Sequence, residues 1–312
     1  MQGNKKRQIS LPAPYMRPHY DVVVIGSGYG GGIAASRMSR AGKRVALLEN
    51  GLERWPGDYP TEFTECIRDV QFSSGEGHKG KRTGMYHFYQ GSGQSAFCGI
   101  LGGTSLLNAN VADPRVWQMS IWPKDINDDF DKKLSRYEHA KEMLEPIPYP
   151  DDYPELPKLR TLEEQAKRLG PEFHKNFSRP PITVTFEDRI NNAGVWQRKS
   201  TLTGNDSTGI NDGSKNSTLM NYLPDAWNHG CEIFCKIDVK SIKQDKKPKK
   251  WFPLVLLEQM RYCFVLKQMN GLEISSQLGQ GFSGNDDFFG FGYNIDLHCN
   301  GVVSPSNFKE PV

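Results

Sequence analysis

The chain has 312 residues, enough for about two domains, and its hydrophobic fraction of 37% and charged fraction of 24% are typical of a globular protein with a sizeable core. A net charge of +3 is nearly neutral and argues against nucleic-acid or membrane-surface binding as the main function. The sequence has neither an apolar run of the roughly 20 residues that a membrane helix needs nor a secretory signal, so we expect an intracellular protein, in the cytoplasm or the peroxisome.

The first predicted elements lie close to the N-terminus. After a tail over residues 1–18 that we expect to be disordered, Tyr20–Ile25 is a run of apolar, β-branched residues typical of a buried parallel strand. A glycine-rich turn follows, then a predicted helix from Ile33 to Ala41 that ends before a glycine. Arg44–Glu49 is predicted to be a second strand, which completes a βαβ unit.

The turn between these strands matches the dinucleotide fingerprint G-x-G-x-x-G. Gly26 permits the tight turn, Gly28 lets the backbone approach a pyrophosphate, and Gly31 allows close packing of the helix on the strand. The helix N-terminus then faces the phosphates. Glu49, at the end of the second strand, is placed to bind ribose hydroxyls and disfavours NADP, but the fingerprint alone leaves FAD and NAD open.

Residues 52–98 are rich in glycine, serine and aromatic residues without sustained periodicity, and we expect loops there. Among the histidines, only His78 and His87 in this stretch are candidates for a catalytic base, with an exposed or structural role as the alternative.

The six cysteines are too scattered for a disulfide scaffold. Cys231 and Cys235 share the parity of one strand face and are predicted to be buried free thiols.

A second glycine cluster spans Gly99–Val111. Gly102 and Gly103, followed by Thr104 and a serine, let backbone and hydroxyl donors approach an anionic group closely. A purely structural turn is the alternative interpretation of this cluster taken alone.

The remaining elements are predicted from periodicity and breakers. In chain order they are an amphipathic helix at Asp128–Leu144, an extended proline-rich linker over 146–157, a helix at Leu162–Leu169, a strand at Ile182–Phe186, a polar loop at Thr201–Ser217, a helix at Leu219–His229 and a strand at Glu232–Val239.

Together with the motif Glu49-Asn-Gly51, the two glycine clusters resemble those of the glucose–methanol–choline (GMC) oxidoreductases. Within that family the likeness is to cholesterol oxidase-like members, through Leu101–Val111, Gly213–Tyr222 and Gly279–Phe288. The resemblance covers roughly residues 18–243 and 271–300. It implies an α/β fold: a Rossmann-like FAD/NAD(P)-binding domain with a parallel sheet, and part of an α+β substrate domain with antiparallel strands.

The resemblance also implies the cofactor, FAD, and the residues that bind it. These are Gly26, Gly28 and Gly31 at the pyrophosphate, Glu49 at the adenosine ribose, Gly102, Gly103 and Thr104 along the phosphates and flavin, Asn108 near the isoalloxazine ring, and Val239 at adenine. No metal site is expected. The implied domain order is a tail (1–18), the FAD-binding domain in two parts (19–112 and 201–245), a substrate or cap part (113–200), an atypical segment (246–270) and the start of the substrate domain (271–312).

Two departures from the family pattern bear on activity. Residues 246–269 contain no glycine where the family has a further phosphate-approaching turn, and we interpret this stretch as a frame change or a mis-spliced exon. Relatives are considerably longer, and the resemblance places a catalytic His–Asn or His–His pair beyond Val312. We therefore expect a truncated chain and assign no catalytic residue.

Three function classes follow. The first is an FAD-dependent oxidoreductase that oxidises a CH–OH group of a small-molecule alcohol, or of a sterol, by hydride transfer to flavin, with oxygen as acceptor. The second is a truncated, catalytically inactive flavin-binding fragment of such an enzyme. The third is an NAD-dependent reductase with the same fingerprint, disfavoured by the second glycine cluster. Two phosphate-type glycine clusters fit a pure interaction protein least well. Neither a nucleic-acid partner nor an integral membrane segment is expected.

Overall fold

The computed structural model describes residues 8–90, 94–112 and 130–240. Its helices are η1 (Ala13–Tyr15), α1 (Tyr29–Arg40), α2 (Phe63–Arg68), η2 (Gly103–Leu106), α4 (Phe130–Leu144), α5 (Pro157–Leu169), α6 (Pro171–Lys175) and α7 (Tyr222–Asn228). Its strands are β1 (Val22–Ile25), β2 (Val45–Leu48), β3 (Val70–Ser74), β4 (Gly77–Gly80), β5 (Tyr86–Gln90), β6 (Gln94–Cys98), β7 (Arg189–Ile190), β8 (Trp196–Gln197) and β9 (Glu232–Phe234). The atypical segment 246–270 and the motif Gly279–Phe288 lie outside the described residues.

A parallel sheet with strand order β1-β2-β9 contains the predicted βαβ unit. β1 pairs in register with β2, and Leu47 of β2 pairs with Ile233 of β9. The apolar residues of β1 and β2 suit a sheet that is covered on both faces. The mixed α/β architecture with a parallel sheet is thus confirmed.

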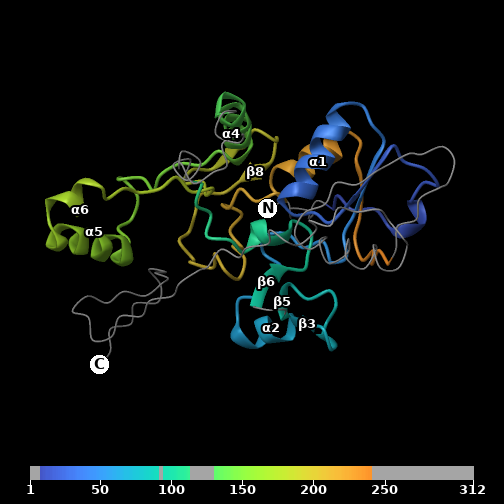
Figure 1. The fold of residues 1–312 in the computed structure, drawn as a ribbon, viewed down its shortest axis with the longest axis horizontal. Coiled ribbons are helices and arrows are strands. Elements are labelled where there is room, and N and C mark those ends of the chain that lie inside the picture. The colour runs from blue at the N-terminus through green and yellow to red at the C-terminus, as the bar shows by residue number, and fades with distance from the viewer. Residues whose placement is uncertain (1–7, 91–93, 113–129, 241–312) are drawn as a thin grey trace, which may run out of the picture.

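Helix α1 begins at Tyr29, four residues before the predicted start at Ile33. The prediction assigned the glycines to a turn, but here they form the first turn of the helix, where close packing on β1 outweighs the poor intrinsic helix propensity of glycine. From Gly32 to Arg40, α1 packs beside α7 (Figure 1). Asp225 of α7 accepts hydrogen bonds from Ser36 Oγ at 2.6 Å and from Arg40 Nη2 at 2.5 Å.

The main core fills the face of the parallel sheet that α1 and α7 cover, and Val24, Leu47 and Ile233 are at most 1% exposed there. Cys231 belongs to this core and Cys235 packs against it. Both thiols are free, as predicted, but only Cys231 is fully buried, whereas Cys235 is half-buried. Phe234, of opposite parity, packs on the other face.

Residues 52–98 do not form loops throughout, contrary to the prediction. They contain α2 and a four-stranded sheet of order β4-β3-β5-β6, drawn below the parallel sheet in Figure 1. The periodicity is hidden because β3 is inverted: Gln71 and Ser73 point inward, whereas Phe72 is 54% exposed. Hydrogen bonds compensate this burial, including one from Gln71 Nε2 to the carbonyl of Gly84 at 2.8 Å.

The middle of the chain is less regular than predicted. α4 agrees with the expected amphipathic helix, whereas α5 begins at Pro157, five residues before the predicted start, because proline is well tolerated in the first turn. Ile182–Phe186 forms no regular strand, because its partners change along its length. Ile182 bridges Val111 and Ile147, and Val184 bridges Lys215.

The last two predicted elements are shorter than expected. Helix α7 begins at Tyr222 rather than at Leu219, and β9 ends at Phe234 rather than at Val239. Between β9 and Val239 the backbone instead bonds to the segment after β2, and Lys236 there has a positive φ of 62°. That conformation cannot continue a strand.

Part of the N-terminal segment packs against the parallel sheet. Residues 8–18 are ordered, whereas the prediction made all of 1–18 disordered. Ile9 is 1% exposed, and Ser10 forms a parallel bridge with Ile233 at the edge of β9. The carboxylate of Glu53 holds both residues through their N–H groups, at 2.9 and 2.8 Å.

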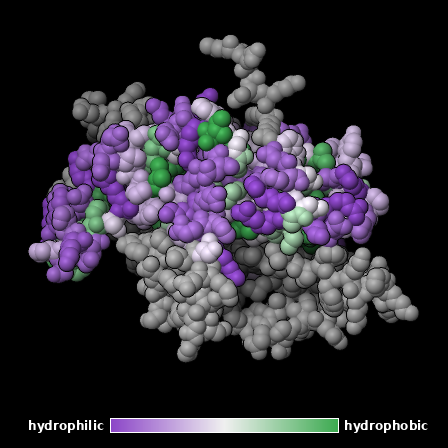
Figure 2. All heavy atoms as spheres, turned by 90° about the horizontal axis from the view of Figure 1, so that it is seen from above, coloured by the Kyte–Doolittle hydropathy of each residue, from purple (hydrophilic) through white to green (hydrophobic). Residues whose placement is uncertain are grey.

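On the face seen in Figure 2, the described residues form a mostly hydrophilic surface with small, separate hydrophobic areas. Within the described part of the chain, no helix has both the length and the hydropathy to cross a membrane.

Candidate functional site

The predicted fingerprint forms a tight turn at the end of β1. Gly26 has a φ of 86°, in the region that favours glycine. A Cβ on Gly31 would lie 2.0 Å from the carbonyl oxygen of Gly26, so only glycine fits where α1 meets the turn. A Cβ on Gly28, by contrast, would have no atom within 4 Å. The backbone at Gly28 is therefore open to a close-approaching ligand.

The N-terminus of α1 faces the same opening. Gly28 is the N-cap, and the first intrahelical bond runs from the N–H of Gly32 to the carbonyl of Gly28 at 2.8 Å. The N–H groups of residues 29–31 precede this bond and belong to the set that a helix leaves for other acceptors. Together with the positive end of the helix dipole they favour an anionic group.

The second glycine cluster packs directly on the first. Gly102 and Gly103 have φ values of 108° and 56°, and the chain enters η2 at this point. A Cβ on Gly103 would come within 2.6 Å of Gly28 Cα, so glycine is required for the two backbones to touch. The structure thus brings together Gly26, Gly28, Gly102 and Gly103, which are distant in the sequence.

Hydrogen bonds tie Glu49 to both clusters. Oε2 of Glu49 accepts from Ser27 N at 3.1 Å and from Ser27 Oγ at 2.5 Å, and Oε1 accepts from Gly51 N at 2.9 Å. Ser27 Oγ in turn accepts from the N–H of Gly102 at 2.9 Å. Glu49 as a whole is 8% exposed, so its carboxylate lies buried between the two clusters.

Two buried hydroxyl groups form hydrogen bonds with the backbone of the second cluster. Ser105 Oγ and Thr218 Oγ1 both donate to the carbonyl of Gly102, at 2.7 and 2.8 Å, and Ser105 Oγ accepts from the N–H of Thr218 at 3.0 Å. Ser27, Ser105 and Thr218 were not among the site residues predicted from the sequence. The only signal for Thr218 was its place in the Gly213–Tyr222 segment.

The end of the second cluster is joined to α1. Asn108 Nδ2 donates to the hydroxyl oxygen of Tyr29 at 2.7 Å, so the side chain expected near the isoalloxazine ring is anchored to the first turn of the helix. Burial raises the pKa of Tyr29, and the phenol stays protonated at neutral pH. Thr104 is exposed at the start of η2 and makes its backbone contacts within that turn.

Val239 lies beyond the end of β9 and is half-buried. The chain that leads to it runs beside the end of β2, because Lys236 N bonds Gly51 O at 3.0 Å and Ile237 N bonds Glu49 O at 2.9 Å. This backbone path connects Val239 to the carboxylate end of the site.

The two candidate histidines lie on the second sheet, on β4 and β5 respectively. His78 Nδ1 and His87 Nε2 both approach Ser73 Oγ, at 3.0 and 2.8 Å. They are thus part of a serine-centred network of that sheet, which is the structural alternative to a catalytic role. Within the ranges that the structure describes, no group of three or more His, Cys, Asp or Glu side chains could hold a metal ion.

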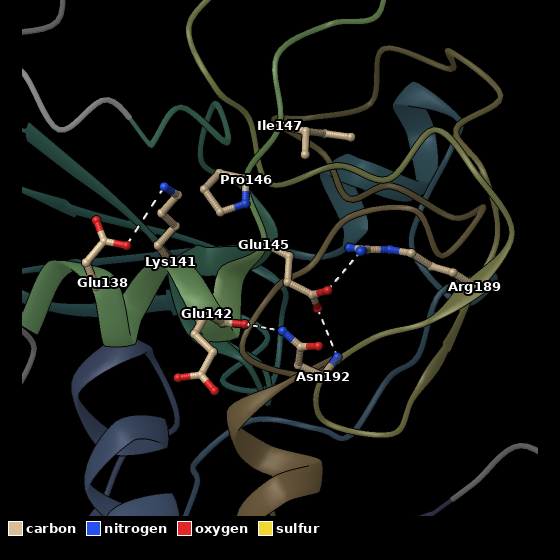
Figure 3. A pocket seen from close by; sticks show the side chains of 8 residues that line it. All are labelled: Glu138, Lys141, Glu142, Glu145, Pro146, Ile147, Arg189 and Asn192. Carbon is tan, nitrogen blue, oxygen red and sulfur yellow. Dashed lines mark hydrogen bonds and ion pairs between the residues drawn. The ribbon is translucent and has the colours of Figure 1, made fainter.

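Two surface pockets lie away from the glycine clusters. The first, of about 310 Å³, lies between the end of α4 and the β7 region; Glu145 points to Arg189, and its Oε1 lies 2.8 Å from Nη1 of that residue (Figure 3). The second, of about 520 Å³, lies beside Arg54 and Asp69. None of the predicted cofactor-binding residues lines either pocket.

Comparison with known proteins agrees with this geometry. Residues 21–54 match the model of the FAD binding domain family. A cholesterol oxidase of Mycobacterium tuberculosis (strain H37Rv) is 26% identical over 244 residues, and one of Acinetobacter baumannii is 25% identical over 241 residues. These alignments cover 73% and 72% of this chain. A long-chain-alcohol oxidase of Arabidopsis thaliana is 42% identical over 52 residues, 16% of this chain and 7% of its own.

The alignments span 41% of the length of each of the two cholesterol oxidases. The matched family model covers β1, the glycine turn, α1, β2 and Glu49. The open backbone at Gly28 and the free first turn of α1 fit the pyrophosphate of a dinucleotide. The cofactor is FAD, as the sequence predicted.

Proposed function

We propose that this chain carries the FAD site of a GMC-type oxidoreductase that oxidises a CH–OH group, with a sterol as the first substrate to test. The observation that carries the proposal is the contact of Gly103 with Gly28, which joins the two glycine clusters at the N-terminus of α1. A dinucleotide site needs only the first cluster, whereas the second extends the site beyond the pyrophosphate. The names of the relatives, cholesterol oxidase and long-chain-alcohol oxidase, support the alcohol class.

In this proposal the domain has a Rossmann-like fold and each part of FAD meets its own set of residues. Gly26, Gly28 and Gly31 with the first turn of α1 hold the pyrophosphate, and Glu49 accepts from the ribose hydroxyls. Val239 lies at adenine, at the end of the backbone path beside Glu49. Gly102, Gly103 and Thr104 line the path towards the flavin. Asn108, held by Tyr29, lies near the ring system.

Bound FAD supplies the hydride acceptor, and oxygen is the proposed final acceptor. The residues of this chain bind and orient the cofactor, and the buried hydroxyls of Ser105 and Thr218 keep the second cluster in place. A base that takes the hydroxyl proton is also required by this chemistry, and we assign that role to none of the described residues.

The first experiment is to purify the 312-residue chain and to record its visible absorption before and after gel filtration. Flavin bands that elute with the monodisperse protein support the FAD site. Anaerobic addition of cholesterol, and separately of a long-chain primary alcohol, then tests the substrate class through bleaching of these bands. Hydrogen peroxide formed on readmission of oxygen measures oxidase turnover.

The outcomes separate the parts of the proposal. A folded chain that remains colourless after incubation with FAD would contradict the cofactor site. Bound flavin that neither alcohol bleaches would contradict the oxidase activity of this chain and leave a flavin-binding protein. Bleaching by the long-chain alcohol alone would replace the sterol by an aliphatic substrate.

A further inference from the structure

Lys215 is a buried cation beside the second glycine cluster. The residue is 5% exposed. Its Nζ donates to the carbonyl oxygens of Asn108 at 2.8 Å, Leu106 at 3.0 Å and Asp206 at 3.4 Å. Within the described residues no carboxylate forms a salt bridge with it. A lysine that is buried without an ion pair is costly and therefore calls for an explanation.

The three bonds use the full donor capacity of an ammonium group. Two of them reach the backbone at the end of η2 and just beyond it, and the third reaches the loop that contains Asp206. A fourth hydrogen bond links the same two segments, because Asn110 Nδ2 donates to the carboxylate of Asp206. Lys215 thus joins two backbone segments that make no regular secondary structure with each other.

The segment that Lys215 holds is strained and polar. Asn110 has a φ of 66° and is 4% exposed, which is an unusual backbone conformation for a buried residue other than glycine. Among the described residues, no donor reaches Oδ1 of Asn110. Two residues earlier, Asn108 donates to Tyr29. Such a backbone keeps its shape only when its surroundings fix it.

We propose that Lys215 is a positioning residue for the segment Leu106–Asn110: its three hydrogen bonds fix the backbone that presents Asn108 to FAD. The proposal rests on the function proposed above, in which Asn108 lies near the flavin. Lys215 does not touch the cofactor in this arrangement. It acts through the carbonyl groups of Leu106 and Asn108.

Because Lys215 is titratable, the proposal predicts that the opening of the segment depends on pH. Burial lowers the pKa of Lys215 to about 8, against the opposing effects of Asp206 and Cys98, the titratable groups that face it. When the segment opens and exposes the amine, its pKa returns towards the ordinary value near 10.5. Above pH 8 the closed state has therefore released a proton that the open state still holds, so opening becomes harder as the pH rises.

The test is amide hydrogen exchange of the segment 104–112 in the chain without added FAD, with rates corrected for the intrinsic effect of pH. In the wild type, protection should rise by up to about tenfold between pH 8 and pH 9, as one linked proton requires. Lys215→Met should exchange faster at pH 7 and show no such rise, because it has neither donors nor a titrating group. Lys199→Met, which removes an exposed lysine, is the matched control and should behave as the wild type.

FAD affinity is measured on the same variants by flavin fluorescence. Lys215→Met should weaken binding by at least tenfold, with Lys199→Met unchanged. Faster exchange throughout the chain, β1 and β2 included, would show that Lys215→Met destabilises the whole fold. In that case the wild type alone provides the test. If its protection at 104–112 does not rise between pH 8 and pH 9, the proposal is overturned. Equal exchange in Lys215→Met and wild type would overturn it as well. A wild type that shows the pH effect but does not bind FAD would refute the role at the cofactor and the proposed function together, while leaving the hydrogen bonds of Lys215 in place.

Discussion

Gly28 and Gly31 belong to one turn, yet the structure gives them opposite reasons to be glycine. Gly31 has no room for a side chain because the carbonyl of Gly26 occupies that space. Gly28 has room, and its φ of −63° suits any residue. The fold therefore requires glycine at position 31, whereas at position 28 the proposed contact with the pyrophosphate is the reason for glycine.

The same substitution at these two positions should separate folding from binding. Gly31→Ala should lower the free energy of unfolding of the apoprotein by about 2 kcal/mol or more, because the new methyl group overlaps backbone atoms. Gly28→Ala should cost the apoprotein at most about 1 kcal/mol, because alanine is a poorer N-cap than glycine, and should weaken FAD binding about tenfold or more, or about 1.4 kcal/mol. Urea unfolding and FAD titration measure the two effects. Equal FAD affinity of Gly28→Ala and wild type would argue that the pyrophosphate lies elsewhere.

At the scale of elements, one buried carboxylate provides hydrogen bonds and an ion pair between α1 and α7. Asp225 is 3% exposed and accepts from Ser36 Oγ and from the Arg40 guanidinium. Burial by itself raises the pKa of Asp225, but the bonds from Arg40 and Ser36 outweigh it and leave the pKa below its ordinary value. The stability that this group contributes is therefore present at neutral pH and is lost as the pH falls through the folded-state pKa.

Asp225→Asn should reduce the free energy of unfolding at pH 7 by about 2 kcal/mol, because Arg40 and Ser36 lose their charged acceptor. The difference between variant and wild type should shrink as the pH falls below the ordinary aspartate pKa of 3.8 and approaches the lower folded-state pKa of Asp225. Denaturant unfolding between pH 3 and pH 7 measures this difference. Asp21→Asn removes a solvent-exposed ion pair with Arg44 and serves as the control, with a much smaller effect expected. A constant difference across the pH range would contradict the assignment.

The elements also show which parts of the fold the sequence could predict. The βαβ unit was predictable because its signals are local: an apolar run, three glycines and a carboxylate at fixed spacing. The second sheet was not, because β3 buries Gln71 and exposes Phe72, which reverses the pattern on which strand prediction depends. Polar side chains can face inward there because Gln71 and Ser73 find hydrogen-bond partners from other parts of the chain.

In the candidate site, the glycines and Glu49 were predictable, but the contacts that hold them were not. The bonds of Thr218 to Gly102 and of Lys215 to Asn108 connect residues more than a hundred positions apart. Nothing in the local sequence around Thr218 or Lys215 specifies such a partner. A resemblance could assign the Gly213–Tyr222 segment to the family, but only the three-dimensional structure shows that it contacts the second cluster.

For the whole molecule, FAD binding and folding should be linked. The proposed FAD-binding residues come from the glycine turn, the end of β2, the second cluster and the segment after β9, so a ligand that contacts all of them holds distant segments together. FAD at a hundredfold excess over its Kd should add about 2.7 kcal/mol to the free energy of unfolding. Thermal unfolding at increasing FAD concentration measures this, with AMP as a control that can occupy only the adenosine end. A melting temperature that does not change with FAD would contradict the binding site.

The pairing of β2 with β9 has a consequence for biosynthesis. Val24 meets Leu47 soon after both have been synthesised, whereas Leu47 meets Ile233 only after the second sheet and the helices α4 to α7 have been made. Closing this much longer loop costs about 2 kcal/mol more in chain entropy than closing the first. On the ribosome, β2 must therefore wait for its second neighbour with one edge uncovered. During that interval the uncovered edge of β2 presents unpaired N–H and C=O groups to which a strand of another chain can pair.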